Sequence, residues 1–492
     1  MERADVIVVG AGGSGAVLAA RLSEDPGRRV LVLEAGPVPR RRDGFGADLL
    51  DARLVPGARP GHPALQPYDV HLTPAHPYTV VRGRYLGGST TVNGGYFVRA
   101  RRADFDRWSA AGGPVWSYDR VLPFLRALET GLARTELDHP AADKFRTAAL
   151  RLGFPEEPDK NADGAPGFGP VPTNTADGVR LNTGLSHLLD ALNRPNLRVH
   201  GGSTALRVVV DRGRATGVEF ARAGRRETVY GGEVVLCAGA LRSPHLLHLS
   251  GIGPRRELEA LGIPVVSDVP EVGARFGDHP QVVLEWHPGC ALPEPSGSWL
   301  GGALHLPASD GNHPSGDLEI LQSLVPMAGL TSGRVSVPGA PLAFLASVQT
   351  PRPTGRMRTV SADPGTPPMF AYGYLSTAED RRRLREVVRV TAELAGPGLV
   401  APGVAVLRDD RLLDEWVRER LGTAQHLCGT VPLGSAVDGY GRVRGVAGLR
   451  VADTSLLPVP PLRGPAATAV LVGEVIAAGI LQVVVPGGEL AD

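Results

Sequence analysis

The sequence predicts an α/β fold with two lobes, one of which contains an open parallel sheet flanked by helices. Two observations predict it. The chain has 492 residues, which exceeds a typical single domain and suffices for two buried cores. A short β-branched run near the N-terminus is followed by a glycine-rich turn, a helical pattern and a second apolar run. This order is that of a βαβ unit, the building block of parallel sheets.

The first βαβ unit carries a dinucleotide-binding fingerprint. Residues 6–9 form the predicted strand, the turn 10–15 reads GAGGSG, and a helix is predicted over 16–22. In such a turn the first glycine makes the bend, the second admits a pyrophosphate, and the last lets helix and strand pack closely. The helix N-terminus offers unpaired N–H groups to phosphates. The predicted cofactor-binding residues here are Gly10, Gly12, Gly13, Ser14 and Gly15.

The second strand of the unit, residues 30–33, ends at an acidic residue, Glu34. An acidic side chain about 20 residues beyond the glycines accepts hydrogen bonds from a ribose, so Glu34 and the adjacent Ala35 are predicted to bind the cofactor. The acidic residue favours FAD or NAD over NADP, and this segment does not distinguish FAD from NAD. The alternative is a glycine-rich turn before an ordinary helix. Both strands and Glu34 in register argue against that alternative.

The composition excludes several classes of function. Lys and Arg total 52 against 51 for Asp and Glu, so the net charge of +1 gives no general attraction to nucleic acid. Three separated cysteines without a CxxC cannot build a disulfide framework or a zinc site, and we predict no metal. No stretch is predicted to span a membrane, and the N-terminus lacks a basic signal region. We therefore expect a cytoplasmic protein, and a peripheral association with the inner face of the membrane stays open.

Three further blocks follow the fingerprint in a fixed order. Residues 82–95 read RGRYLGGSTTVNGG, residues 234–254 contain VVLCAGA and LSGIGP, and residues 425–455 contain QHLCGTVPLG and GLRVADTS. In this order they resemble the signatures of the glucose-methanol-choline (GMC) family of FAD-dependent oxidoreductases. Asp278-His279-Pro280 resembles another landmark of that family. With the fingerprint, the matches extend over residues 5–480, nearly the whole chain.

The resemblance implies the GMC fold, an α/β architecture. A Rossmann-like FAD-binding domain is joined to a discontinuous α+β substrate domain that is built on an antiparallel sheet. The FAD-binding domain is expected from residues 1–150, 200–280 and 420–492. The substrate domain is expected from residues 151–199 and 281–419.

Regular elements are also predicted outside the fingerprint. In the substrate domain, residues 283–286, 318–321 and 343–346 are apolar strand-like runs, and residues 377–395 form a helical pattern that ends at Gly396-Pro397. A last helix is predicted from Pro465 to about residue 480. Proline has the fixed φ that suits a first helical turn. In the family, the positive end of this helix faces the flavin pyrimidine edge, where it would stabilise the anionic reduced flavin.

The resemblance also assigns contacts to a noncovalent FAD. A glycine-rich turn that leads into small hydroxyl residues suits backbone contact with a flat ring and a diphosphate. Val92 stands where covalently flavinylated members carry histidine, so no covalent bond is expected. Asp453 matches an acidic FAD contact, with a turn cap as the alternative. The complete set of further FAD-binding residues is Arg82, Gly87, Gly88, Asn93, Gly94, Gly95, Ala205, Ala238, Gly239, Asp453, Ala466 and Thr468.

Catalysis is expected at His426, which matches the family's base. The base takes the proton of an alcohol while hydride leaves the carbinol carbon for flavin N5, and a pKa near neutrality suits that role. Family members usually carry a second His or Asn before the last helix, but residues 457–468 contain neither. Arg463 is the one strong donor there; it could hold the substrate oxygen but cannot act as a base. The alternative for Arg463 is a bond to a local carbonyl or exposure to solvent.

The blocks around Asn93 and His426, with the short length of the chain, resemble the mycofactocin-associated branch of the family. That branch reoxidises mycofactocinol, the reduced form of a peptide-derived redox cofactor, and passes electrons toward the respiratory chain. The expected partners are thus mycofactocinol and a respiratory electron acceptor. Two alternatives stay open. One is an alcohol or sugar oxidase of the family that uses oxygen, and the other is a flavin-binding electron-transfer protein without alcohol oxidation, suggested by the missing second His or Asn.

Overall fold

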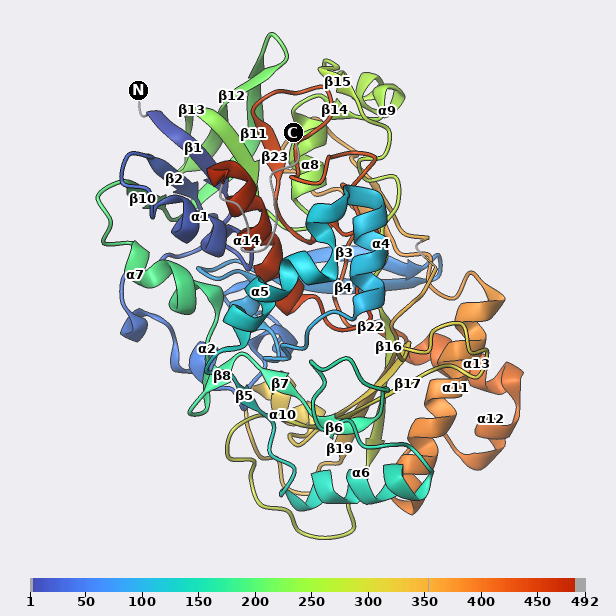
Figure 1. The fold of residues 1–492 in the computed structure, drawn as a ribbon. Helices are drawn as coiled ribbons and strands as arrows, with labels where there is room; N and C mark the ends of the chain where they lie inside the picture. The colour runs from blue at the N-terminus through green and yellow to red at the C-terminus, as the bar shows by residue number, and fades with distance from the viewer. Residues whose placement is uncertain (1–2, 353, 483–492) are drawn as a thin grey trace.

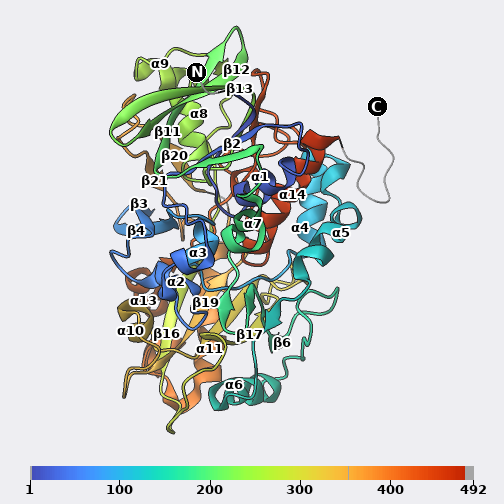
Figure 2. The same ribbon diagram turned by 90° about the vertical axis from the view of Figure 1, so that its left-hand side faces the viewer.

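The computed structural model describes residues 3–352 and 354–482, which fold into two stacked lobes (Figures 1 and 2). One lobe contains a seven-stranded, mainly parallel sheet, and the other contains a six-stranded antiparallel sheet. The predicted fold class is confirmed. The ends of the predicted FAD-binding segments, residues 1–2 and 483–492, lie outside the described residues.

The seven-stranded sheet is organised around the N-terminal strand, as the fingerprint predicts. Its order is β10-β2-β1-β13-β12-β11, and β23 also pairs with β13. Strands β10, β2, β1, β13 and β23 run parallel, and β13, β12 and β11 form an antiparallel meander. The bounds are β1 (Arg3–Val9), β2 (Val30–Leu33), β10 (Leu197–His200), β11 (Ser203–Asp211), β12 (Arg214–Arg222), β13 (Arg225–Leu236) and β23 (Leu449–Val451). Strand β2 and the last four residues of β1 are buried on both faces, which explains their continuous apolar runs.

Two helices from opposite ends of the chain pack side by side on this sheet, α1 (Gly15–Leu22) and α14 (Ala466–Leu481) (Figure 1). Helix α14 buries every residue from 467 to 477 except Ala469, and α4 (Arg102–Gly112) and α5 (Tyr118–Glu129) lie beside it. The prediction that α14 starts at Pro465 was wrong by one residue. Pro465 has a helical φ of −79° but a ψ of 5°, so it is the N-cap and the helix begins at Ala466.

The antiparallel sheet has the order β22-β16-β19-β18-β17-β6. The three strands predicted for this lobe are confirmed within β16, β18 and β19. The bounds are β6 (Phe168–Pro170), β16 (Pro280–Trp286), β17 (Leu300–Leu306), β18 (Leu318–Ser323), β19 (Leu342–Val348) and β22 (Gly422–Thr423). The predicted helix is α11 (Ala378–Ala395), which packs on the sheet beside α6 (Pro140–Arg151) and α13 (Asp410–Arg420). It ends at Gly396, whose φ is 58°.

Some segments contribute to both lobes. The hairpin of β3 (Leu65–Thr73) and β4 (His76–Gly83) lies between the sheets, and its buried residues join α6 in the core of the antiparallel lobe (Figure 1). Strand β22 follows the substrate segment in sequence and completes the antiparallel sheet. The division at residues 150, 200, 280 and 420 stays a prediction.

Shorter elements connect these units. They are helices α2 (Ala47–Leu50), α3 (Ser89–Val92), α7 (Leu189–Ala191), α8 (Ser243–Leu249), α9 (Arg255–Ala260), α10 (Met327–Ser332) and α12 (Val404–Arg408), and strands β5 (Ala133–Arg134), β7 (Pro172–Thr173), β8 (Thr175–Ala176), β9 (Val179–Arg180), β14 (Ile252–Gly253), β15 (Ser267–Asp268), β20 (Arg356–Arg358) and β21 (Met369–Ala371).

Candidate active site

The glycine-rich turn between β1 and α1 brings backbone into close contact with backbone. Gly10 has a φ of 101°, and a Cβ placed on it would lie 2.5 Å from the carbonyl oxygen of Cys237 on the neighbouring strand end. A Cβ on Gly15 would overlap the carbonyl oxygen of Gly10. Both positions therefore require glycine, and this packing directs the N-terminus of α1 at the sheet edge, where a diphosphate would bind.

The second predicted glycine block contacts the first. A Cβ on Gly88 would lie 2.7 Å from the Cα of Gly12, and the N–H of Gly87 donates to the carbonyl of Ala11 at 2.8 Å. Ser14 Oγ donates to the carbonyl of Ala469 at 2.6 Å, which ties the fingerprint to α14. The segments around Gly12, Gly88, Cys237 and Ala469 are far apart in sequence and thus meet at the predicted cofactor site.

Glu34 supports the glycine-rich turn from the end of β2. Its two carboxylate oxygens accept hydrogen bonds from the N–H groups of Ala11 and Gly36, each at 2.7 Å. Burial raises the pKa of Glu34, although these two N–H groups oppose the shift. Each oxygen keeps a second lone pair for a ribose hydroxyl. Ala35 accepts a bond from Arg84 Nε at 3.2 Å through its carbonyl.

The N-terminus of α14 offers donors on the other side of the same site. Thr468 Oγ1 is buried and has no hydrogen-bond partner among the described residues, and Ala466 opens the helix with free N–H groups in its first turn. Asn93 is held by a bond from the N–H of Gly95 to its Oδ1 at 3.1 Å, and the carbonyl of Gly94 accepts from Trp299 Nε1 at 2.7 Å. The Thr468 hydroxyl, the N-terminus of α14 and the glycines of the two blocks (Gly10 to Gly15, Gly87 and Gly88) together form what we call the cofactor cradle. Groups of these kinds fit FAD.

The remaining predicted cofactor residues lie on strands of the seven-stranded sheet or shortly after them. Asp453 follows β23, and its Oδ2 accepts bonds from the N–H of Gly239 at 2.9 Å and from Ser243 Oγ at 2.6 Å. Its Oδ1 accepts from the N–H of Ser455 at 2.9 Å, so Asp453 caps this turn, and burial raises its pKa. Ala238 lies beside Gly239, and Ala205 lies on β11. Contacts of these residues with FAD stay predictions.

His426 is paired with a second histidine. Its Nδ1 lies 3.0 Å from Nδ1 of His279, and the two rings meet edge to face at 86°. The carboxylate of Asp278 holds both residues, because its Oδ1 accepts the backbone N–H groups of His279 and His426, each at 2.7 Å. Burial lowers the pKa of His426 to about 4 and that of His279 to about 3, so both rings are neutral at neutral pH. The pKa of His426 thus lies below the near-neutral value predicted from the sequence, because the ring is removed from water.

The backbone in front of His426 is strained. Gln425 has a φ of 63°, a left-handed conformation that costs energy for a residue with a side chain. Its Oε1 accepts bonds from the N–H of Val81 at 2.8 Å and from the Arg82 guanidinium at 3.3 Å, and these contacts hold the turn. The predicted cofactor residue Arg82 is thereby linked through Gln425 to His426, the predicted base.

Arg463 is fully buried and donates to backbone carbonyls. Its Nη1 bonds the carbonyls of Leu462 at 2.7 Å and Gly316 at 3.0 Å, and its Nη2 bonds that of Ser315 at 3.1 Å. Nε has no partner among the described residues. The next residue, Gly464, faces the site: a Cβ there would lie 3.3 Å from Cε1 of His426 and 3.0 Å from Cδ1 of Tyr96. A contact of Arg463 with a substrate oxygen stays a prediction.

A buried charged network lies behind Tyr96. Its hydroxyl donates to Glu319 Oε2 at 2.8 Å, and His305 Nε2 lies 2.9 Å from the same oxygen. The other ring nitrogen of His305 faces Glu157, which also accepts from Lys160 Nζ at 2.7 Å. Burial would raise the pKa of Glu319, but the bonds from His305 and Tyr96 and the charge of Arg463 lower it to about 2. The carboxylates therefore balance the buried cations.

The sequence reasoning did not identify His279, Tyr96 or Glu319 as site residues. His279 stood in the quoted DHP landmark and Tyr96 directly after the first block, so both had a signal. Glu319 belongs to none of the quoted blocks and lies within a predicted strand, so no motif marked it. Cys428 is fully buried and its thiol pKa is raised by burial, as expected of a small core residue. Among residues 3–352 and 354–482, no three candidate ligands cluster around a metal position, and none of the helices there could span a membrane.

Comparisons with known proteins agree with this geometry. The family models described as GMC oxidoreductase match residues 4–281 and 351–473. An uncharacterised GMC-type oxidoreductase of Rhodococcus erythropolis is 37% identical over 96% of this chain and 97% of its own. An oxygen-dependent choline dehydrogenase of Rhizobium etli is 31% identical over 97% of this chain and 96% of its own. The formate oxidase of Aspergillus oryzae superposes with a TM-score of 0.87 at 23% identity over 98% of both chains, which shows the shared fold.

Both family models match this chain, and relatives above 30% identity match it over nearly its full length. These matches agree with the sequence blocks, the paired histidines and the cofactor cradle. The chain belongs to the GMC oxidoreductase family and is an FAD-dependent oxidoreductase that acts on the CH–OH group of donors.

Proposed function

We propose that this protein reoxidises mycofactocinol, with His426 as the base, and passes the electrons toward the respiratory chain. The geometry that supports alcohol oxidation is the pair His426 and His279, fixed by Asp278 beside the cofactor cradle. The blocks around Asn93 and His426 support the choice of donor. Bound FAD supplies a hydride acceptor at flavin N5.

The hydrogen bond between the histidines determines which nitrogen can act. For His426 to accept a proton at Nε2, its Nδ1 must carry the ring proton and donate it to Nδ1 of His279. The acceptor is then Nδ1 of His279, so the proton of the neutral His279 ring is on Nε2, which has no hydrogen-bond partner among the described residues. The lowered pKa of His426, about 4, keeps its Nε2 lone pair available at neutral pH.

We propose that the cofactor is held without a covalent bond by the cradle described above, with Val92 at the position of the covalent histidine. We also propose Arg463 as the residue that replaces the family's second polar group. Its unpaired Nε and the adjacent Gly464 beside His426 support a place at the site. A cation there would stabilise negative charge on the substrate oxygen as the proton leaves.

The experiment that tests the proposal is anaerobic mixing of the purified holoenzyme with mycofactocinol and, separately, with primary alcohols and choline, while flavin absorbance is recorded. We expect mycofactocinol to bleach the flavin and His426→Ala to slow this bleaching roughly 100-fold or more, with an unchanged FAD content. Flavin that is bleached only by a simple alcohol, with peroxide formed in air, would support the oxidase alternative. An unchanged rate in the variant would exclude His426 as the base and favour the electron-transfer alternative.

A further inference from the structure

We propose that Arg383, on the outer helix α11, is a positioning residue for the active site. It fixes the loop between β17 and β18, residues 307–317, and this loop in turn holds Arg463 and so the loop that carries Gly464 beside His426. The inference rests on the proposed function of that site.

The inner end of the connection is the Arg463 guanidinium. Its three bonds to backbone carbonyls include two to the 307–317 loop, at Ser315 and Gly316. Gly316 has a φ of 82°, and a Cβ on it would lie 2.8 Å from Pro166, so the carbonyl is presented from a tightly packed turn. The loop that contains Arg463, residues 457–465, is also held by a second contact, in which the N–H of Leu462 donates to the Asp104 carboxylate at 3.1 Å.

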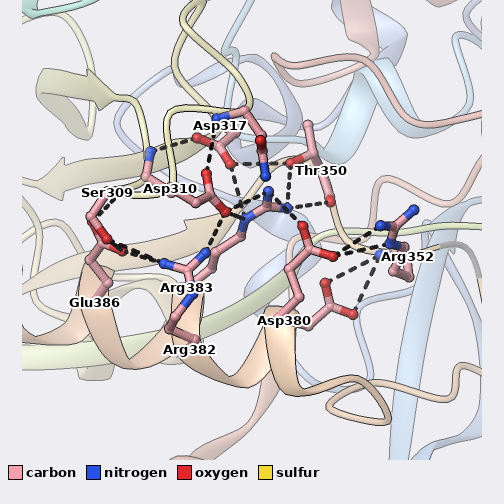
Figure 3. Close-up of polar contacts among 12 residues, drawn as sticks. Ser309, Asp310, Asp317, Thr350, Arg352, Asp380, Arg382, Arg383 and Glu386 are labelled. Atoms are coloured by element: carbon pink, nitrogen blue, oxygen red, sulfur yellow. Dashed lines mark hydrogen bonds and ion pairs between the residues drawn. The ribbon is translucent and has the colours of Figure 1, made fainter.

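The outer end is a cluster of charges around Arg383 (Figure 3). Arg383 is 2% exposed and lies within ion-pair distance of Asp310 Oδ2 at 3.0 Å, Glu379 Oε1 at 2.9 Å and Asp317 Oδ2 at 3.4 Å. It also donates to the carbonyl and hydroxyl oxygens of Thr350, both at 3.3 Å. Asp310 is the fourth residue of the 307–317 loop and Asp317 is its last, so the Arg383 guanidinium contacts the loop near both ends, and Arg382 on the same helix also pairs with Asp310.

Asp317 adds further bonds that fix the base of the loop. Its Oδ1 accepts the N–H of Ala308 at 2.8 Å, and its carbonyl accepts the N–H of Gln349 at 2.7 Å. Because Asp317 is fully buried, removal of its cationic partner would leave a buried charge without compensation. The loop therefore has one well-determined arrangement as long as Arg383 is in place.

A continuous series of contacts connects this cluster with His426. Arg383 binds the ends of the loop, the loop carbonyls bind Arg463, and Gly464 follows Arg463 directly in the chain. A Cβ on Gly464 would be 3.3 Å from Cε1 of His426, so the backbone at Gly464 lies directly beside the ring of the proposed base. A small displacement of a positioned group can reduce the rate of a reaction many-fold.

The test compares substitutions in the holoenzyme. Arg383→Lys keeps the charge and loses the planar fork, and Asp310→Asn weakens the cluster at a carboxylate that is 17% exposed, whereas Asp317 is fully buried. The matched control is Arg385→Gln on the same helix, because Arg385 is also mostly buried and pairs with two acids, Asp410 and Asp414, that lie outside the loop. Each variant is examined by amide hydrogen exchange of residues 457–465 and by the rate of flavin reduction at saturating and at low donor concentration.

We expect exchange in residues 457–465 to rise roughly tenfold in Arg383→Lys and Asp310→Asn and to stay unchanged in Arg385→Gln. We also expect a roughly tenfold lower rate at saturating donor, with KM changed less. Combination of Asp310→Asn with Arg463→Lys should give a less than additive loss, whereas Arg385→Gln with Arg463→Lys should be additive. Unchanged exchange, or an equal rise in the Arg385 variant, would overturn the proposal. If no donor reduces the flavin, the proposed function fails, and the exchange measurement still decides this inference.

Discussion

The contact between Nδ1 of His426 and Nδ1 of His279 limits what the proposed base, His426, can do. With one nitrogen of His426 in contact with His279, the opposite nitrogen alone can face a substrate. The two rings lie on different segments, 147 residues apart, yet both are anchored by one oxygen of Asp278. Although burial raises the pKa of Asp278 to about 6, the carboxylate stays largely ionised at neutral pH and can accept both N–H groups.

This arrangement predicts the effect of His279→Ala. Loss of the imidazole removes the acceptor for His426 Nδ1–H, so the His426 ring is free to take the other tautomer or to rotate. We expect the rate of flavin reduction to fall roughly tenfold or more, with FAD content and far-UV circular dichroism unchanged. The control is His71→Ala, a substitution of an exposed histidine on β3. A His279 variant with the rate of the wild-type protein would show that the pair does not orient the base.

At the scale of elements, the packing of α1 on α14 holds the cofactor cradle together. Gly473 approaches α1 so closely that a Cβ would lie 2.6 Å from the carbonyl of Ser14. The buried Glu474 of α14 also accepts a hydrogen bond from Arg21 Nε of α1 at 2.8 Å, which links the two helices. The exposed Glu24 accepts from Nη1 of the same arginine at 2.9 Å.

Because Arg21 pairs with one buried and one exposed glutamate, substitution of each partner shows how burial changes the contribution of an ion pair to stability. Glu474→Gln keeps the shape but removes the charge from a side chain that is 5% exposed, and we expect a loss of about 1 kcal/mol in the free energy of unfolding. Glu24→Gln should change it by less than about 0.5 kcal/mol, because exposed ion pairs contribute little. Urea unfolding monitored by flavin fluorescence measures both. An equal effect of the two substitutions would mean that the burial of Glu474 is irrelevant to the packing of these helices.

Local sequence patterns were sufficient for the elements that are long or strongly periodic. Strands β1 and β2, helix α1 and helix α11 could be predicted because their burial is visible as runs and repeats in the sequence. Strand β22 could not, since it has two residues and exists only by pairing with β16. The side-chain partners of Arg463 were equally hidden. Ser315 and Gly316 lie 148 and 147 residues away, and no local pattern connects a buried guanidinium with the carbonyls of a distant loop.

At the scale of the whole molecule, the boundary between the lobes carries buried ionisable groups from both sides. Tyr96 and Arg463 belong to the segments that surround the cofactor cradle, whereas Glu157, His305 and Glu319 belong to the antiparallel lobe. Removal of one charge from such a buried set leaves its partners uncompensated. The relative position of the lobes is therefore coupled to the ionisation of these groups, and acid should destabilise the structure.

The pKa values of the buried histidines determine in which direction stability changes with pH and over which pH range. Burial lowers the pKa of His245 and His279 to about 3 and that of His248 and His426 to about 4, against about 6.5 in the unfolded chain. The unfolded chain therefore binds more protons than the native state between these values, and stability must fall as the pH falls from about 6.5 toward 4. Asp278, whose pKa is raised to about 6, opposes the effect and offsets less than one histidine.

We expect the free energy of unfolding to be lower at pH 5.5 than at pH 7.5 by roughly 1 kcal/mol for each of these four histidines, before the contribution of Asp278. His187, whose pKa burial also lowers to about 4, acts in the same direction. The measurement is the urea midpoint of the holoenzyme at the two pH values. The two ring nitrogens of His248 contact Thr359 Oγ1 at 2.9 Å and the carbonyl of Val272 at 3.1 Å, so His248→Gln should reduce the pH dependence without an effect on flavin reduction. A midpoint that is equal or higher at pH 5.5 would show that the buried rings are protonated in the native state, and the neutral base proposed for His426 would then have to be abandoned.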